Sequence, residues 1–292
     1  MYYKTTPFRL FNAFNIVFLC VLAVTCLLPL VHTLAISLSG KAPVSANLVG
    51  LWPIDFTLDA YKKTLDNPQF LTALRISFER TIIGTIFGLA ITVLAAYPLS
   101  KDGGVFKSRG SYSWFFLVTL FFGGGLIPTY IVIQKLGLMN SFWVLILPSA
   151  LNVWMIVLLL NYFRTVPKEL EEAALIDGAG QFRILFTVII PVSLPAMATM
   201  ALFIMVGHWN AWFDGLIYMS KSDKYPLATF LQTILASIDT MRLTIDKNSM
   251  ANFSNKTVKT AQVFIGALPV LLVYPFLQRY FIKGLVLGAV KE

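Results

Sequence analysis

The sequence predicts an all-α protein that crosses a membrane six times. Of its 292 residues, 57% are hydrophobic and only 13% are charged, whereas a soluble domain is about 45–50% apolar and about 25% charged. Six stretches of 19 to 31 residues contain no Asp, Glu, Lys or Arg, and the next longest such stretch has 14. A spanning helix needs about 20 apolar residues. The six runs of 19 residues or more are therefore long enough to span a membrane, and the run of 14 is too short.

The uncharged runs are typical of helices because they are apolar on every side, as in Val153 to Leu160. A transmembrane barrel strand would alternate in polarity over about ten residues. The 24 Phe, 11 Tyr and 6 Trp exclude a disordered chain. The predicted spans are residues 12–37, 78–100, 113–134, 141–163, 191–216 and 261–282.

The first span leads into a polar segment, residues 38–77, whose charges cancel. Within it, Thr57 precedes Leu58, Tyr61 and Leu65 at helical spacing, and Asp59 lies in the first turn. This pattern predicts a short surface helix.

Glycines mark the second and third spans. Gly84 and Gly88 lie four residues apart in the second span and are expected to let another helix approach closely. In the third span, the run 123–125 is all glycine and Pro128 follows. We expect this run to bend the helix or to allow close packing.

The fourth span places Asn152 and Trp154 at mid-depth. An amide inside a membrane needs a hydrogen-bond partner, and an indole offers a flat face. Both residues are therefore candidates for the substrate pathway, and the alternative is an interhelical hydrogen bond.

The loop after the fourth span, residues 164–190, has the pattern of two short helices outside the membrane. Thr165 can cap the first helix and Pro167 suits its first turn. Gly178 allows the left-handed turn that ends a helix, and a second helix is predicted from Gln181 to Ile190. Such an elbow, tied to two spans, could transmit motion from a partner, but an ordinary solvated connection explains the residues equally well.

The fifth span begins at Pro191 and ends near an aromatic cluster. At about 1.5 Å per residue, Trp209 lies about 27 Å from Pro191, near the opposite membrane surface. Trp209, Asn210 and Trp212 are candidates for a surface on which sugar rings stack. The alternative is an aromatic belt at the lipid boundary.

Several activities are disfavoured by what the sequence lacks. No Asp, Glu, Lys or Arg lies in the middle of a predicted span, which argues against an ion-coupled secondary transporter. The chain has no His-Glu-x-x-His motif and no phosphate-binding Gly-x-x-x-x-Gly-Lys-Ser/Thr loop, so neither a membrane-embedded hydrolase nor ATP hydrolysis by this chain is expected. The net charge of +9 comes from basic residues in loops beside spans, so a nucleic-acid partner is not expected either.

Four motifs then resemble one family. Glu172-Ala173-Ala174, Gly178 and Val188-Ile189-Ile190-Pro191 resemble the EAA loop of ABC importer permeases. Residues 172–179, 95–101, 209–212 and 278–291 are similar to motifs of the carbohydrate-importer branch, whose maltose permease has such a C-terminal tail. Val188 and Ile190 stand where the family has Ile and Leu. The first 70 residues match only in hydropathy.

The resemblance implies a type I ABC importer permease fold of the MetI-like kind. Residues 1–69 would hold the N-terminal tail, the first transmembrane helix and an external loop, and residues 70–292 the core domain, with its coupling loop at 164–190. By this resemblance, the residues that couple the permease to the ATPase are Glu172, Ala173, Ala174, Asp177, Gly178 and Pro191. A tail contact to the ATPase falls on Gly288 and Lys291.

The same resemblance implies a transport subunit rather than an enzyme, carrying no cofactor or metal of its own. It would move a sugar or oligosaccharide delivered by an extracellular solute-binding protein. Two separate ATP-binding subunits would hold ATP and Mg²⁺, and a homologous second permease would complete the pore. The counts of Lys and Arg in alternate loops, 11 against 10, do not decide the orientation. The resemblance places both termini in the cytoplasm of a prokaryote, with the chain in its plasma membrane.

Overall fold

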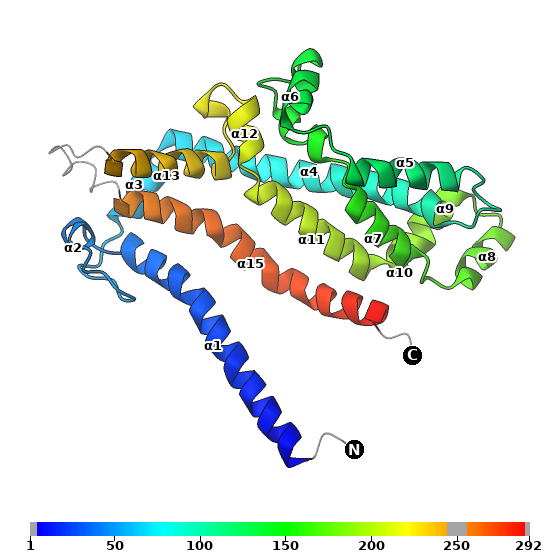
Figure 1. The fold of residues 1–292 in the computed structure, drawn as a ribbon, viewed down its shortest axis with the longest axis horizontal. Coiled ribbons are helices and arrows are strands. Elements are labelled where there is room, and N and C mark those ends of the chain that lie inside the picture. The colour runs from blue at the N-terminus through cyan, green and yellow to red at the C-terminus, as the bar shows by residue number, and fades with distance from the viewer. Residues whose placement is uncertain (1–4, 244–255, 290–292) are drawn as a thin grey trace. The chain divides into compact units, whose positions relative to one another are not determined.

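A computed structural model describes residues 5–243 and 256–289, and every regular element in these ranges is helical (Figure 1). The predicted all-α class is therefore confirmed for the described chain. Contacts between residues divide the chain into two units. Unit 1 comprises residues 1–71 and 233–268, and unit 2 comprises residues 72–232 and 269–292.

Unit 1 contains the first predicted span and the segment after it. Its elements are α1 (Thr6–Ser37), α2 (Lys41–Ser45), α3 (Asp59–Leu65) and parts of α13 (Leu227–Leu243) and α15 (Lys256–Ala289). The predicted surface helix is α3, and the backbone N–H of Asp59 donates to the Thr57 hydroxyl at 3.2 Å. A small core of Ala35, Val44 and Val49 joins α1 to the segment that follows it.

Unit 2 is built on α4, a helix of 33 residues that begins in unit 1. Its bounds and those of the other helices are α4 (Pro68–Ser100), α5 (Arg109–Phe121), α6 (Leu126–Lys135), α7 (Val153–Phe163), α8 (Lys168–Ile176), α9 (Gln181–Ile184), α10 (Ile190–Val192), α11 (Leu194–Asn210) and α12 (Phe213–Tyr218). Short 3-10 turns cover Phe142–Leu145, Leu147–Ser149 and Ser222–Lys224, and a π turn covers Leu185–Ile189. The main core joins buried side chains of α4, α7, α9, the π turn and α11.

The described helices supply up to six membrane spans, in agreement with the prediction. Three are long and apolar enough to cross a membrane unbroken, namely Thr6–Ser37, Pro68–Ser100 and Lys256–Val273. Three further spans are pairs of helices bent at a short break. The bends are 116° between α5 and α6, 51° between Phe142–Ser149 and α7, and 85° between Gln181–Val192 and α11.

Two of the three breaks have a local cause, and only the glycine run was expected. The glycine run bends the third span as predicted, and Gly125 has a φ of +77° that other residues rarely adopt. The fourth and fifth spans were predicted to be continuous, and this was wrong. The fifth restarts at Leu194 because Pro195 has no N–H to donate to the preceding turn. Pro191 therefore lies in α10, just before the bend, rather than at the start of a straight span.

The predicted role of the two glycines in the second span is confirmed. A Cβ on Gly84 would lie 2.5 Å from Nε2 of His208, and one on Gly88 would lie 3.3 Å from Ile204. Both neighbours are on α11, so α4 and α11 approach closely where side chains are missing. His208 is buried, and Trp209 next to it packs edge-on against Phe78 at 5.2 Å between ring centroids.

We expect Gly84→Ala to destabilise the protein by about 1–3 kcal/mol, because an added methyl group overpacks a well-filled contact. Gly207→Ala is the matched control, since Gly207 is on α11 beside His208 and has no atom within 4 Å of its Cβ position. In a helix that control should be neutral or stabilising by up to about 1 kcal/mol. The two midpoints of thermal unfolding in detergent measure the difference, and equal midpoints would refute the close-packing role of Gly84.

Candidate functional site

The loop 164–190 forms the elbow that its sequence indicates. The helix α8 ends at Ile176 and Gly178 follows with a φ of +76°. The N–H groups of Gly178 and Ala179 donate to the carbonyls of Leu175 and Ala174, at 3.0 and 2.9 Å. This paired closure is the Schellman motif, which stops a helix and turns the chain sharply. The predicted second helix is confirmed as the continuous stretch Gln181–Val192, with its π turn at 185–189.

The predicted cap of the first helix was wrong. The hydroxyl of Thr165 donates to the carbonyl of Tyr162 at 2.7 Å, and Pro167 occupies the N-cap position without a side-chain cap. Thr165 therefore closes the end of α7 instead. The helix α8 can begin without a cap because Glu169 and Glu171 lie in its first turn. Their negative charges interact favourably with the positive end of the helix dipole.

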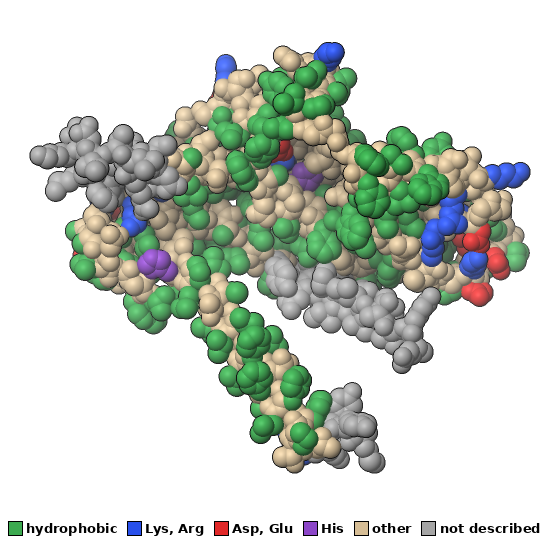
Figure 2. Space-filling view, in the orientation of Figure 1, with side chains coloured by type: hydrophobic (Ala, Val, Ile, Leu, Met, Phe, Trp, Pro, Cys, Tyr) green, Lys and Arg blue, Asp and Glu red, His purple; other side chains and the backbone are tan. Residues whose placement is uncertain are grey.

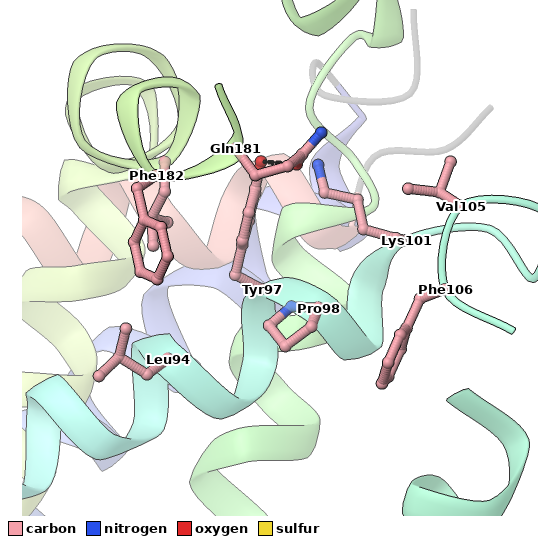
Figure 3. A pocket seen from close by; sticks show the side chains of 9 residues that line it. Leu94, Tyr97, Pro98, Lys101, Val105, Phe106, Gln181 and Phe182 are labelled. Carbon is pink, nitrogen blue, oxygen red and sulfur yellow. Dashed lines mark hydrogen bonds between the residues drawn. The ribbon is translucent and has the colours of Figure 1, made fainter. Parts of the chain in front are cut away.

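Contacts to the end of α4 hold the elbow in place. Lys101 forms an ion pair with Glu171, and its ammonium lies 4.0 Å from the centroid of the Tyr97 ring. The Tyr97 hydroxyl donates to Oε1 of Gln181 at 2.8 Å (Figure 3). These contacts reach both arms of the elbow from the last turn of α4 and the residue after it, so the three elements are linked directly.

A second, exposed ion pair joins the same elements. Nζ of Lys168 lies 2.6 Å from Oδ2 of Asp102, with both side chains largely in solvent. The Lys168 ammonium holds the pKa of Asp102 below its ordinary value, and the carboxylate in turn raises the pKa of Lys168. An exposed pair of this kind contributes little stability. The partly buried Lys101–Glu171 pair is the more important tie.

Arg164 strengthens the junction between α7 and α4. Its guanidinium donates to the carbonyl of Leu99 at 3.3 Å. Burial, together with nearby Arg109, lowers the pKa of Arg164 from its ordinary value, but an arginine stays protonated at any physiological pH. The junction therefore keeps its positive charge.

A cavity of about 270 Å³ lies at the base of the elbow (Figure 3). The residues that line it come from α4, the loop after it and the start of the second arm: Leu94, Tyr97, Pro98, Lys101, Val105, Phe106, Gln181, Phe182 and Leu185. Most of these side chains are apolar. Within the described residues, no three His, Cys, Asp or Glu side chains are grouped so that they could hold a metal ion.

The outer surface of α8 is open to a partner. Glu172, Ala173, Asp177 and Gly178 are exposed, and Ile176 is 86% exposed. Ala174 instead packs against the main core of unit 2. Small side chains beside exposed carboxylates and an exposed isoleucine give a surface that another protein can approach closely. Figure 2 shows acidic and basic side chains gathered at the end of unit 2 that carries α8.

The candidate pathway residues of the fifth span differ in their exposure and contacts. Trp209 is only 7% exposed, so its ring packs inside the protein rather than offering a stacking surface. The Asn210 amide donates to the carbonyl of Val206 at 2.9 Å. Trp212 is the more exposed indole, in edge contact with Phe213. A role of these residues in substrate passage remains a prediction.

The other candidates are explained by local structure or lie at the chain end. Asn152 is the N-cap of α7, and its Oδ1 accepts from the Met155 N–H at 3.3 Å. This satisfies the amide oxygen without a partner on another helix. Trp154, two residues on, is exposed. Gly288 is in the last turn of α15, and Lys291 lies outside the described residues.

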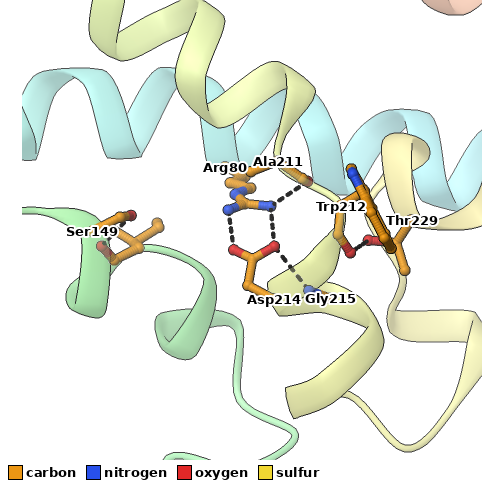
Figure 4. A network of polar contacts seen from close by, with 8 residues as sticks. Arg80, Ser149, Ala211, Trp212, Asp214, Gly215 and Thr229 are labelled. Atoms are coloured by element: carbon orange, nitrogen blue, oxygen red, sulfur yellow. Dashed lines mark hydrogen bonds and ion pairs between the residues drawn. The ribbon is translucent and has the colours of Figure 1, made fainter. Parts of the chain in front are cut away.

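A buried polar network was missed from the sequence (Figure 4). Arg80 of α4 is only 1% exposed and forms an ion pair with Asp214 of α12. Its Nη1 also donates to the carbonyl of Ala211 at 3.0 Å, and Oδ1 of Asp214 accepts from the Gly215 N–H at 2.8 Å. The sequence does hold a hint of this pair, because Arg80 directly precedes one uncharged run and Asp214 directly follows another.

The comparisons with known proteins agree with this geometry. Residues 91–286 match the family described as "Binding-protein-dependent transport system inner membrane component". A polygalacturonan/rhamnogalacturonan transport system permease protein of Bacillus subtilis is 38% identical over 97% of this chain and 99% of its own length. A trehalose/maltose transport system permease protein of Thermococcus litoralis is 27% identical, over 92% of this chain and 93% of its own.

Among solved structures, a chain of a bacterial ABC transporter involved in the import of the acidic polysaccharide alginate superposes with a TM-score of 0.85. It is 29% identical and the match covers 95% of this chain and 99% of that one. Sequence and fold therefore agree over nearly the whole length. This chain belongs to the binding-protein-dependent family of inner membrane components, the permease subunits of ABC importers.

Proposed function

We propose that this permease imports an oligosaccharide and that the elbow at 164–190 is the point at which an ATP-binding subunit drives it. Support for the substrate class comes from the relatives, whose names specify polygalacturonan/rhamnogalacturonan and trehalose/maltose, and from the alginate transporter. The observation that carries the coupling role is the exposed surface of α8 on an elbow held to α4 by Lys101–Glu171 and Tyr97–Gln181.

The same contacts explain how a push on α8 reaches the membrane helices. One arm of the elbow continues from α7, the other leads into α11, and the side-chain ties reach the end of α4. Displacing α8 therefore acts on three membrane helices at once. The bend at Ser193 separates the second arm from α11, so α11 can reorient there while the elbow keeps its shape.

The proposal requires a defined set of partners. An importer of this family works with an ATPase and a solute-binding protein. The finer arrangement proposed is two ATP-binding subunits, which hold ATP and Mg²⁺, and a homologous second permease. Both termini are then cytoplasmic and residues 38–77 face the exterior. Residues 70–292 form the transport core, with Gly288 and Lys291 of the tail touching the ATPase.

The energy source separates this proposal from an ion-coupled carrier. In cells that express the whole transporter, we expect uptake of a labelled oligosaccharide to persist when a protonophore is added at constant ATP. We expect it to stop when ATP is depleted. Uptake that is abolished by the protonophore while ATP is held constant would overturn the proposal. A panel of acidic galacturonide and alginate oligomers against neutral maltodextrins would identify the substrate class.

A further inference from the structure

An apolar loop in unit 1 has an unusual combination of composition and position. No charged residue lies between Lys41 and Asp55. Residues 46–54, here called the apolar loop, carry Leu48, Leu51, Trp52 and Ile54, all exposed, and the exposed Phe56 follows just after Asp55. Trp52 is 83% exposed and Leu48 is 67% exposed. Large apolar side chains so concentrated on one short segment indicate an interaction surface.

The loop is fixed to α1 by hydrogen bonds. His32 Nδ1 lies 2.8 Å from the carbonyl oxygen of Gly50. Nearer the end of α1, the Gly40 N–H donates to the carbonyl of Ile54 at 3.0 Å, and the Ile54 N–H donates to the Ser39 hydroxyl at 3.0 Å. Val49 is buried in the small core with Ala35 and Val44. The apolar loop is therefore folded back along α1 rather than extended into water.

The bond to His32 gives the depth of the loop in the bilayer. The uncharged part of α1 begins at Leu10, and the helix ends at Ser37. At about 1.5 Å per residue this part is about 42 Å long. A bilayer with its headgroup layers is about 40–45 Å thick, around a hydrocarbon core of about 30 Å. His32 is about 7.5 Å inward from Ser37. With α1 placed across the bilayer along its normal, Gly50 lies where the headgroup layer meets the hydrocarbon.

We propose that the apolar loop inserts its exposed side chains into this interfacial layer of the bilayer and anchors unit 1 there. Tryptophan favours this layer, because its ring is apolar and its N–H needs a polar partner. Pairing of the Gly50 and Ile54 carbonyls and of the Ile54 N–H reduces the cost of placing this backbone in the layer. The surface continues that of α1, whose Leu28 and Val31 are exposed just below. A soluble partner could not reach side chains at this depth.

Collision measurements on a spin label test the proposal directly. The free Cys20 and Cys26 are replaced by serine, and a nitroxide is attached at Trp52→Cys in the whole transporter in lipid nanodiscs. The matched control is Lys63→Cys on α3, which is exposed in the same unit. We expect oxygen to relax the label at position 52 several-fold more strongly, relative to a water-soluble nickel chelate, than the label at position 63. If the Trp52 variant does not assemble, Leu48→Cys gives the same reading.

Every other result counts against the proposal. A label at 52 that nickel reaches as easily as at 63 would mean that the loop is in water. A label protected from both oxygen and nickel would mean that it packs against protein. Immobilisation on addition of the solute-binding protein would assign the loop to that partner instead. None of these results bears on the coupling role of the elbow, which lies between the fourth and fifth spans.

Discussion

Reversing the charge of Glu172 is expected to stop transport while leaving the protein in the membrane. The side chain is exposed on α8, and the ion pairs that hold this helix to the core use Glu171 and Lys168 instead. Glu172→Lys therefore leaves both ion pairs in place, and its main effect is on the surface that the elbow presents. Under the proposed function, that surface is buried against the ATP-binding subunit.

The expected loss is large because a charge buried at an interface cannot be left without its partner. Removing one member of such a pair costs about 2–5 kcal/mol of binding free energy, and about 1.4 kcal/mol is tenfold in affinity. Uptake should fall by about 30-fold or more, and the ATPase should no longer co-purify. The measurements are sugar uptake, ATPase recovery and the amount of permease in the membrane.

Glu79→Lys is the matched control for this experiment. It makes the same change on a partly exposed side chain of α4, which pairs with the exposed Arg75 one turn earlier. An exposed pair contributes about 0–1 kcal/mol, so uptake should stay near normal. Gly178→Asp gives a second test, because it adds both backbone strain at φ +76° and a charge on the same surface. Normal uptake with Glu172→Lys and Gly178→Asp would contradict the coupling role.

Removing Asp214 is expected to be the most destabilising single change in the core. Arg80 is almost fully buried, and Asp214 supplies its counter-charge. Among the described residues, Asp214→Ala leaves the buried guanidinium with the Ala211 carbonyl as its remaining hydrogen-bond partner. Breaking a buried pair in this way costs about 3–5 kcal/mol of stability. Thermal unfolding of the purified protein in detergent measures the loss.

The double variant distinguishes an unpaired charge from lost packing. Arg80→Met with Asp214→Ala removes both charges, and apolar replacements of buried pairs are often neutral or stabilising. The double variant should therefore unfold at a higher temperature than Asp214→Ala alone. If the double variant loses as much stability as Arg80→Met and Asp214→Ala lose separately in sum, the network of Figure 4 does not depend on charge pairing.

The sequence alone was enough for the spans and for the elbow, because both depend on local signals. The lengths of the uncharged runs predicted six crossings, and Pro167 and Gly178 predicted a short helix that ends at a tight turn. A proline or a left-handed glycine acts on its own turn of backbone, wherever the rest of the chain lies. The packing of Gly84 and Gly88 was predictable for a similar reason, since small residues at helical spacing favour close contacts.

Only the tertiary structure decided which side chains meet. Arg80 and Asp214 are 134 residues apart, Tyr97 and Gln181 are 84 apart, and Lys101 and Glu171 are 70 apart. Hydropathy cannot pair such residues, and it cannot tell that Trp209 is buried while Trp212 is exposed. It also did not reveal where the fourth and fifth spans break, because an apolar run has the same hydropathy whether its helix is straight or bent.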